Sequence, residues 1–187
     1  MNSGDGGVGK TTFLKRYTTS RFLEVSKETI GTGFFTKSIY YKPGKPDKQS
    51  GSKSGKKSTK ERIDLTLWDL GGQDRFRYIV RDFIYGSAGA LLFFDITRYK
   101  TFEGLEEWMD ILRSKEEKGA LPMPILLVGS KNDLDLLREI DEKEIKEFVK
   151  SHDLIGYVEC SSKTGDNVEL AVNTLVRHIF NTNKGIF

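Results

Sequence analysis

The chain has 187 residues, which is the length of one domain with a sizeable buried core. Hydrophobic residues make up 37% and charged residues 30% of it, as in a soluble globular protein, and no apolar run approaches the roughly 18 residues of a membrane-spanning helix. The net charge of +3 is unevenly distributed, because residues 42–62 carry +6 and the rest carries −3. A single cysteine, Cys160, excludes an internal disulfide, and with no signal-peptide pattern this favours a cytoplasmic protein.

The first motif along the chain is glycine-rich and matches the phosphate-loop pattern G-x-x-x-x-G-K-[ST]. In such a loop several backbone N–H groups point at one anion, the lysine reaches the outer phosphates, and the threonine hydroxyl can hold Mg²⁺. Phe13, Leu14 and Tyr17 have helical spacing, so we expect a helix whose N-terminus faces the phosphates. The residues expected to bind a nucleoside triphosphate are Gly4, Asp5, Gly6, Gly7, Val8, Gly9, Lys10, Thr11 and Thr12.

The segment before this loop is unusually short. A phosphate loop normally follows a buried strand, and a central strand needs about five or six residues. Only Met1, Asn2 and Ser3 precede Gly4. We therefore expect the first strand to be missing or truncated, at a position in the middle of the sheet.

A strand and a basic segment follow the first helix. Gly33–Tyr41 is rich in Phe, Thr, Ile and Tyr, which predicts a strand. Residues 42–62 have no apolar side chain between Lys42 and Arg62, so we expect a disordered insertion in a hairpin connection. Two interpretations remain open for it: a solvated insertion, which we favour, or a polybasic arm for weak electrostatic contact with an anionic membrane or nucleic acid.

The next strand ends in a second motif. Arg62–Asp69 alternates apolar and polar residues, as a half-buried strand does. A carboxylate at its end, Asp69, can hold Mg²⁺. It begins the run Asp-Leu-Gly-Gly-Gln-Asp, in which the N–H of Gly72 can approach a γ-phosphate and Gln73 can orient an attacking water.

The remaining sequence alternates apolar runs with amphipathic stretches. Strands are expected at 88–94, 125–128 and 157–160, and helices at 102–117, capped by Thr101, at 142–151, capped by Asp141, and along 168–179. We expect the apolar stripe of the last helix to face the core rather than a partner. This alternation predicts an α/β fold of the P-loop NTPase type, with three layers around a mostly parallel sheet, as a single domain over residues 1–187.

Two further motifs follow strands, at the sheet edge where such folds bind ligands. In Ser130-Lys131-Asn132-Asp133, the carboxylate of Asp133 can accept hydrogen bonds from the N1–H and amine of guanine, and the stem of Lys131 can cover the base. Adenine would leave that carboxylate unpaired, which gives strong discrimination. Ser161, Ser162 and Lys163 can offer backbone N–H groups to the guanine carbonyl.

Four motifs in this order resemble the Ras superfamily of small GTPases over nearly the whole chain. Thr29-Ile30-Gly31, residues 83–97 and Trp108 look most like the Rab branch, while Asp-Leu-Gly-Gly-Gln looks more like Arf or Gα proteins. The resemblance implies that Thr29 senses the γ-phosphate and completes the Mg²⁺ shell, and that Phe22 packs on the guanine. It also implies that Gly6 stands where a side chain would disturb the catalytic glutamine.

Three departures from the family pattern matter. Ser130 replaces the usual asparagine that ties the base loop to the phosphate loop, so guanine affinity is expected to be reduced. The lysine-rich segment has no counterpart in typical members. The pattern for N-myristoylation is absent and no cysteine lies near the C-terminus, so we expect no lipid anchor.

These features predict a GTP-binding switch with slow, Mg²⁺-dependent hydrolysis. GTP and Mg²⁺ would order two loops, roughly 23–33 and 71–80, and loss of the γ-phosphate would release them. The catalytic residues would be Lys10, Gly72 and Gln73, and the metal ligands Thr11, Thr29 and Asp69. Effectors, an exchange factor and an activating protein are expected from the resemblance. The alternatives are an ATPase of the same loop class and a binding module locked on GTP or GDP.

Overall fold

The computed structural model describes residues 1–23, 29, 31–41, 61–73, 82–114 and 121–183. The strands are β1 (Asn2–Gly4), β2 (Thr32–Tyr41), β3 (Glu61–Leu70), β4 (Ala90–Asp95), β5 (Ile125–Ser130) and β6 (Gly156–Cys160). The helices are α1 (Lys10–Thr19), α3 (Tyr99–Glu103), α4 (Leu105–Arg113), α5 (Glu142–Ser151) and α6 (Val168–Asn183), with a 3₁₀ segment η2 (Asn132–Leu137). No helix within these ranges combines the length and apolar character needed to cross a membrane.

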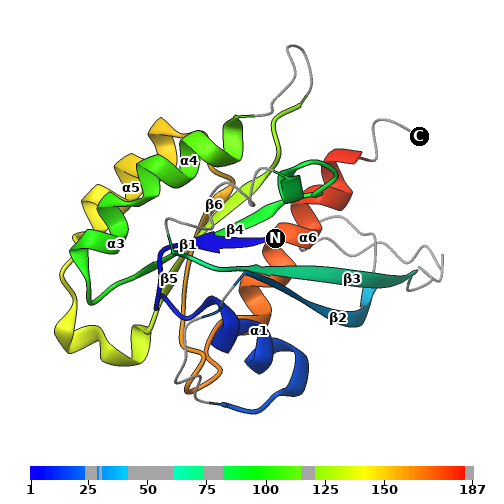
Figure 1. Ribbon diagram of the computed structural model, residues 1–187, viewed down its shortest axis with the longest axis horizontal. Coiled ribbons are helices and arrows are strands. Elements are labelled where there is room, and N and C mark those ends of the chain that lie inside the picture. Colours follow the sequence, from blue (N-terminus) through cyan, green and yellow to red (C-terminus); the bar gives the residue numbers. More distant parts are fainter. Residues whose placement is uncertain (24–28, 30, 42–60, 74–81, 115–120, 184–187) are drawn as a thin grey trace, which may run out of the picture.

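The strands form one sheet in the order β2-β3-β1-β4-β5-β6. Only β2 and β3 pair antiparallel, and the other neighbours pair in parallel. Helices cover both faces, with α1 and α6 on one side and α3, α4 and α5 on the other (Figure 1). The predicted α/β fold with three layers and a mostly parallel sheet is confirmed.

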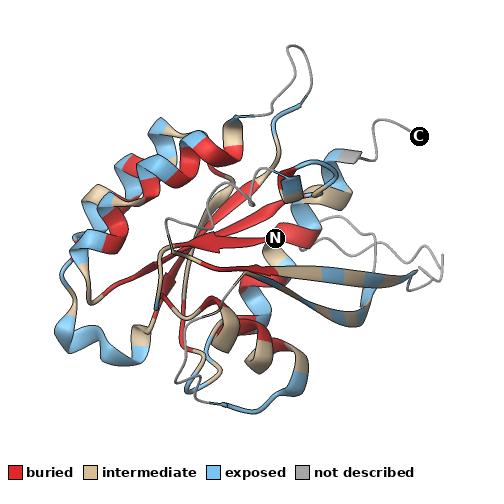
Figure 2. Ribbon diagram, viewed as in Figure 1, coloured by how far each residue is buried: buried red, intermediate tan, exposed pale blue. Residues whose placement is uncertain are grey.

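The central strands contribute to two core regions, one on each face of the sheet, because successive side chains of a strand point to opposite faces. Leu92 and Phe94 of β4 pack with the helices α3, α4 and α5, whereas Leu91 and Phe93 pack with α1 and α6. Every residue of β4 and β5 is buried, as Figure 2 shows for the centre of the sheet. The apolar stripe of α6 belongs to this core, as predicted.

The first strand is present, which corrects the expectation that it is missing. Asn2–Gly4 lies in mid-sheet, where it pairs with β4 at three positions and with β3 at Asn2↔Asp69. It has three residues, whereas β3 has ten. Hydrogen bonds to both neighbours hold this short strand in the sheet, and it leads directly into the phosphate loop.

Two predicted boundaries were wrong. The expected helix over 102–117 is instead α3 followed by α4, and residues 115–120 lie outside the described ranges. Thr101 does not cap it, because its hydroxyl donates to the Arg98 carbonyl and accepts from the N–H of Asp95, which ties α3 to the strand end.

Of the basic segment 42–62, residues 42–60 lie outside the described ranges, whereas Glu61 and Arg62 begin β3. By contrast, Asp141 caps α5 as predicted, in a full capping box with Glu144.

Candidate nucleotide-binding site

The glycine-rich loop connects β1 to α1 at the carboxyl end of the sheet. Gly7 and Gly9 have φ angles of 72° and 93°, in the left-handed region that side chains disfavour, so the loop can turn tightly before the helix. Lys10, Thr11 and Thr12 form the first turn of α1. The side chain of Val8 is fully buried in the core, so it can offer the site only its backbone.

The lysine of this loop is buried beneath it. Lys10 is only 6% exposed, and its Nζ donates to the carbonyls of Gly4 at 2.6 Å and Asp5 at 2.7 Å. Burial lowers the pKa of Lys10 to about 8, although the nearby carboxylates of Asp69 and Asp5 oppose this effect. An incoming anion would stabilise the charged form of this buried lysine, whose hydrogen bonds within the described residues go to neutral carbonyls, as phosphate binding requires.

Oxygen ligands from three segments meet at Thr11. Its hydroxyl donates to Asp69 Oδ2 at 2.6 Å and lies 2.6 Å from the hydroxyl of Thr29. Asp69 is 2% exposed, and its Oδ1 has no hydrogen-bond partner among the described residues. Burial raises the pKa of Asp69, with hydrogen bonding from Thr11 as the main opposing effect.

This set of groups fits a magnesium ion. Mg²⁺ in nucleotide sites is held by one or two protein oxygens together with phosphate oxygens and water. A buried carboxylate with one unpaired oxygen, beside two hydroxyls, is a ligand set of that kind. Among the described residues there is no cluster of three or more His, Cys, Asp or Glu that would instead suit a protein-only metal site.

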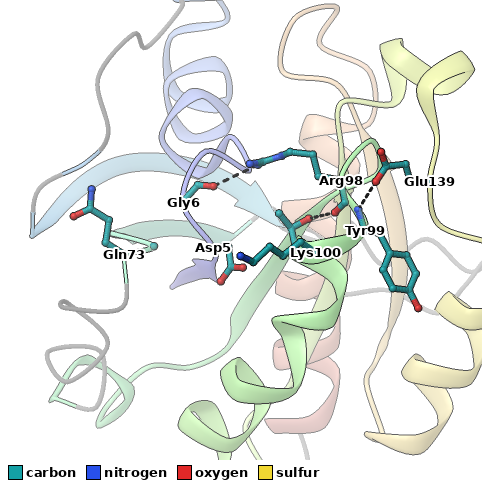
Figure 3. Close-up of a pocket in the computed structure, with 9 residues that line it drawn as sticks. Asp5, Gly6, Gln73, Arg98, Tyr99, Lys100 and Glu139 are labelled. Atoms are coloured by element: carbon teal, nitrogen blue, oxygen red, sulfur yellow. Dashed lines mark hydrogen bonds between the residues drawn. The ribbon is translucent and has the colours of Figure 1, made fainter.

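The Gly-Gly-Gln segment touches the phosphate loop directly. A Cβ atom on Gly72 would collide with the carbonyl of Asp5 and the N–H of Gly6, so only glycine allows this approach. Gln73 lines a cavity of about 40 Å³ together with Gly6, Lys10 and Thr29. It also lines a larger cavity of about 620 Å³, where it lies on the opposite side from Glu139 (Figure 3). The rest of the two predicted switch loops, residues 24–28, 30 and 74–80, falls outside the described residues.

The two base motifs come together beyond β5 and β6. The hydroxyl of Ser161 donates to Asp133 Oδ1 at 2.6 Å and accepts from the backbone N–H groups of Lys163 and Thr164. Asp133 is exposed, Ser162 is half-buried and Lys163 is exposed. Phe22, on the segment after α1, is 40% exposed and forms part of the surface. The structure therefore orients the carboxylate predicted to read guanine.

Comparison with known proteins places this geometry in a family. The model of the Ras family matches residues 3–181. The chain is 38% identical over 173 residues to human Ras-related protein Rab-27B, covering 92% of this chain and 75% of the relative. It is 36% identical over 177 residues to Ras-related protein Rab-11A of Dictyostelium discoideum, covering 95% and 73%.

The chain belongs to the Ras family. It is Rab-like within that family, as its sequence motifs predicted. Members of the Ras family are small GTPases that bind guanine nucleotides and hydrolyse GTP, so the predicted enzyme class is shown at the level of the family.

One departure from the Ras-family pattern has a visible structural result. Ser130 is 5% exposed, and its hydroxyl donates to the Phe94 carbonyl of the neighbouring strand at 2.9 Å. The hydrogen bond that this hydroxyl donates therefore goes to β4 and not to the phosphate loop. The side chain at this position thus ties β5 to β4 rather than to the loop that cradles phosphate.

Three residues beside the loop were not among the predicted site residues. Trp108 of α4 donates its indole N–H to Asp5 Oδ1 at 2.8 Å. Arg98 Nη2 donates to the Gly6 carbonyl at 3.3 Å, as Figure 3 shows. Asp95, at the end of β4, accepts from the side chain of Arg98. A signal existed for Asp95, since it ends an apolar strand as Asp69 does. Neither Arg98 nor Trp108 carries such a signal, because only the fold brings them to the loop.

Proposed function

We propose that this chain is a switch operated by guanine nucleotides, which binds GTP and GDP with Mg²⁺ and hydrolyses GTP slowly on its own. The observation that carries the proposal is the meeting of Thr11, Thr29 and Asp69 oxygens beside the buried Lys10. These groups come from three separate segments of the chain, and a shared ligand explains why they converge. Membership of the Ras family supports the same assignment.

The residues of the phosphate loop would bind the triphosphate through charge and backbone donors. Lys10 would exchange its two carbonyl acceptors for phosphate oxygens, a stronger, charge-assisted pairing. The hydroxyls of Thr11 and Thr29 and the carboxylate of Asp69 would hold the metal. Mg²⁺, when bound, neutralises negative charge on the phosphate oxygens.

Hydrolysis would depend on Gln73 and Gly72. Gln73 would orient the attacking water, and the N–H of Gly72, which lies against the loop, would contact the γ-phosphate. No arginine lies among residues 23–28, just before Thr29, where an intrinsic catalytic arginine stands in Gα proteins. We therefore expect unaided turnover to be lower than turnover with an activating partner by on the order of 10³–10⁵.

Specificity for guanine would rest on Asp133. One of its carboxylate oxygens accepts from Ser161, and its exposure leaves the carboxylate accessible to the N1–H and amine of a base. This arrangement favours a GTPase over an ATPase. A binding module locked on one nucleotide is the second alternative, and the placement of Gln73 beside Gly6 and Thr29 favours an active enzyme over it.

The proposal extends to organisation and partners. We propose a single cytoplasmic GTPase domain over residues 1–187. Its partners would be effectors that recognise the GTP-bound form, an exchange factor and an activating protein.

Changing Asp133 tests the base assignment. In Asp133→Asn the side-chain amide would present a donor to guanine, so GTP affinity should fall by on the order of 10³ or more. Affinity for XTP should rise, because xanthine carries a carbonyl where guanine has an amine. Competition of GTP, XTP and ATP against a fluorescent GDP analogue measures both effects. The control is Asp135→Asn, which removes a neighbouring exposed carboxylate. Unchanged base preference in Asp133→Asn would refute the assignment.

Changing Gln73 tests the enzyme. Gln73→Leu should leave the dissociation rate of GDP within about twofold of wild type, while single-turnover hydrolysis slows by on the order of tenfold or more. The two rates are measured on the same preparation, so a damaged site is distinguished from a missing catalytic group. A wild-type protein that carries GTP and never converts it would support the locked module.

A further inference from the structure

Asp95 is a buried carboxylate between the two halves of the nucleotide site. It ends β4, which pairs with β1 on one side and with β5 on the other, where Asp95 lies opposite Ser130. The residue is fully buried. Its strand therefore lies between the strand that leads into the phosphate loop and the strand that leads into the base loop.

Each carboxylate oxygen of Asp95 has two donor groups within hydrogen-bond distance. Oδ1 accepts from the backbone N–H of Thr97 at 3.0 Å and from its hydroxyl at 2.8 Å. Oδ2 accepts from Nζ of Lys131 at 2.5 Å and from Nε of Arg98 at 2.8 Å. Burial alone would raise the pKa of Asp95, but hydrogen bonds from Lys131 and Thr97 outweigh it and hold the pKa below its usual value. The group is thus an anion at neutral pH.

The two cations on Asp95 extend in opposite directions along the site. Lys131 belongs to the base loop, two residues before Asp133. The guanidinium of Arg98 reaches the phosphate loop, where Nη2 donates to the Gly6 carbonyl and lies 3.5 Å from where a Cβ atom of Gly7 would be (Figure 3). A continuous chain of contacts therefore runs from Gly6 through Arg98 and Asp95 to Lys131.

This chain of contacts spans a gap that Ser130 leaves. The hydroxyl of Ser130 donates to Phe94 and does not extend to the phosphate loop. An ionic link through Asp95 can replace the missing tether between the base loop and the phosphate loop, because the anion holds one cation directed at each loop. Without the anion these two neighbouring cations would repel each other. The outer parts of both cations stay accessible, with side chains 43% and 38% exposed for Arg98 and Lys131.

From this geometry we propose that Asp95 is a positioning residue that couples the base loop to the phosphate loop and thereby slows nucleotide release. This inference rests on the proposed function. Asp95 acts through Arg98 and Lys131 and touches neither nucleotide nor metal.

The test is the dissociation rate of a fluorescent GDP analogue at saturating Mg²⁺, chased with excess GDP. Asp95→Asn keeps the shape and removes the charge, and it should release the analogue at least about tenfold faster, the effect of roughly 1.4 kcal/mol. Asp64→Asn is the matched control. Asp64 also accepts hydrogen bonds from an arginine, Arg62, and from a hydroxyl, that of Ser38, but it is exposed on β3. The control should match wild type.

A double-mutant cycle separates coupling from general stability. Arg98→Ala should accelerate release severalfold, and adding it to Asp95→Asn should accelerate release little further, because both changes break the same chain of contacts. A purely structural role would lower the melting temperature of Asp95→Asn and give additive rates, which would overturn the proposal. If Asp95→Asn does not fold, Arg98→Ala decides, since Arg98 is partly exposed, and wild-type release from that variant would overturn the proposal.

The same data distinguish this inference from the proposed function. If wild type fails to bind the GDP analogue, the function itself is wrong. If wild type binds and Asp95→Asn releases at the wild-type rate, only the coupling is wrong.

Discussion

At the scale of single residues, we expect the buried Lys10 to make nucleotide binding sensitive to pH. Its pKa in the ligand-free protein is about 8, below the ordinary value of 10.5. Between these values the unfolded chain holds a proton that the folded protein has lost, so this group contributes stability that increases as pH rises from about 8 to 10.5. In the proposed site, bound phosphates would favour the charged form of Lys10 and raise its pKa again.

Binding should therefore take up a proton at alkaline pH. We expect GDP binding to absorb close to one proton from the buffer at pH about 9 and close to none at pH about 7. Calorimetric titration in two buffers of different ionisation enthalpy gives the number directly. Proton uptake that is equal at the two pH values would show that the pKa of Lys10 is not lowered.

The site could be predicted from sequence wherever a short motif carries the chemistry. Lys10, Thr11 and Asp69 stand at fixed places relative to glycines and strand ends, and the structure brings them together. Arg98 and Trp108 could not be found this way. Each reaches the loop from a helix or turn about a hundred residues away, so its role depends on how α3 and α4 pack on the sheet.

At the scale of elements, the close approach of β1 to β4 depends on Gly4. Its φ angle is 132°, and a Cβ atom there would collide with the Phe93 carbonyl. We expect Gly4→Ala to destabilise the protein by about 2 kcal/mol or more, since the clash is with backbone and the conformation is strained. Gly33→Ala on β2 is the control, because among the described residues no atom beyond its own chain neighbours lies within 4 Å of its Cβ position.

Thermal or urea denaturation of the two variants measures the difference. An equal midpoint for Gly4→Ala and Gly33→Ala would contradict the packing of β1 against β4.

The strands and helices were predictable where apolar periodicity is strong. They were less predictable where contacts with neighbouring elements determine the conformation of a segment. The apolar runs of β4 and β5 predicted buried strands correctly, to within two residues. The three residues of β1 have no pattern of their own, and their extended form comes from hydrogen bonds to β3 and β4. The division between α3 and α4 lies at Gly104, where a Cβ atom would require the carboxylate of Asp5 to shift.

At the scale of the whole molecule, the basic segment is expected to be dispensable for folding. The ladder of β2 and β3 ends at the pair Tyr41↔Glu61, so deleting residues 45–60 leaves Lys42, Pro43 and Gly44 as a short hairpin connection. GTP binding and melting temperature should change little, because the deleted residues have no apolar side chain and loop closure depends weakly on length.

Both properties are compared with those of the intact chain, together with binding to anionic vesicles at low and high salt. Loss of folding on deletion would contradict the expectation of an insertion. Salt-sensitive vesicle binding that disappears with the deletion would assign the segment to electrostatic membrane contact.

The hydrogen bond from Trp108 to Asp5 gives the molecule an optical reporter of its own phosphate loop. The indole is fully buried, so its emission depends on its protein surroundings rather than on solvent. The chain has two tryptophans, and Trp68→Phe leaves the signal of Trp108 alone. Any movement of Asp5 away from the indole alters the field at this chromophore. The state of the loop can thus be followed in real time without attaching a dye to the protein or to its ligand.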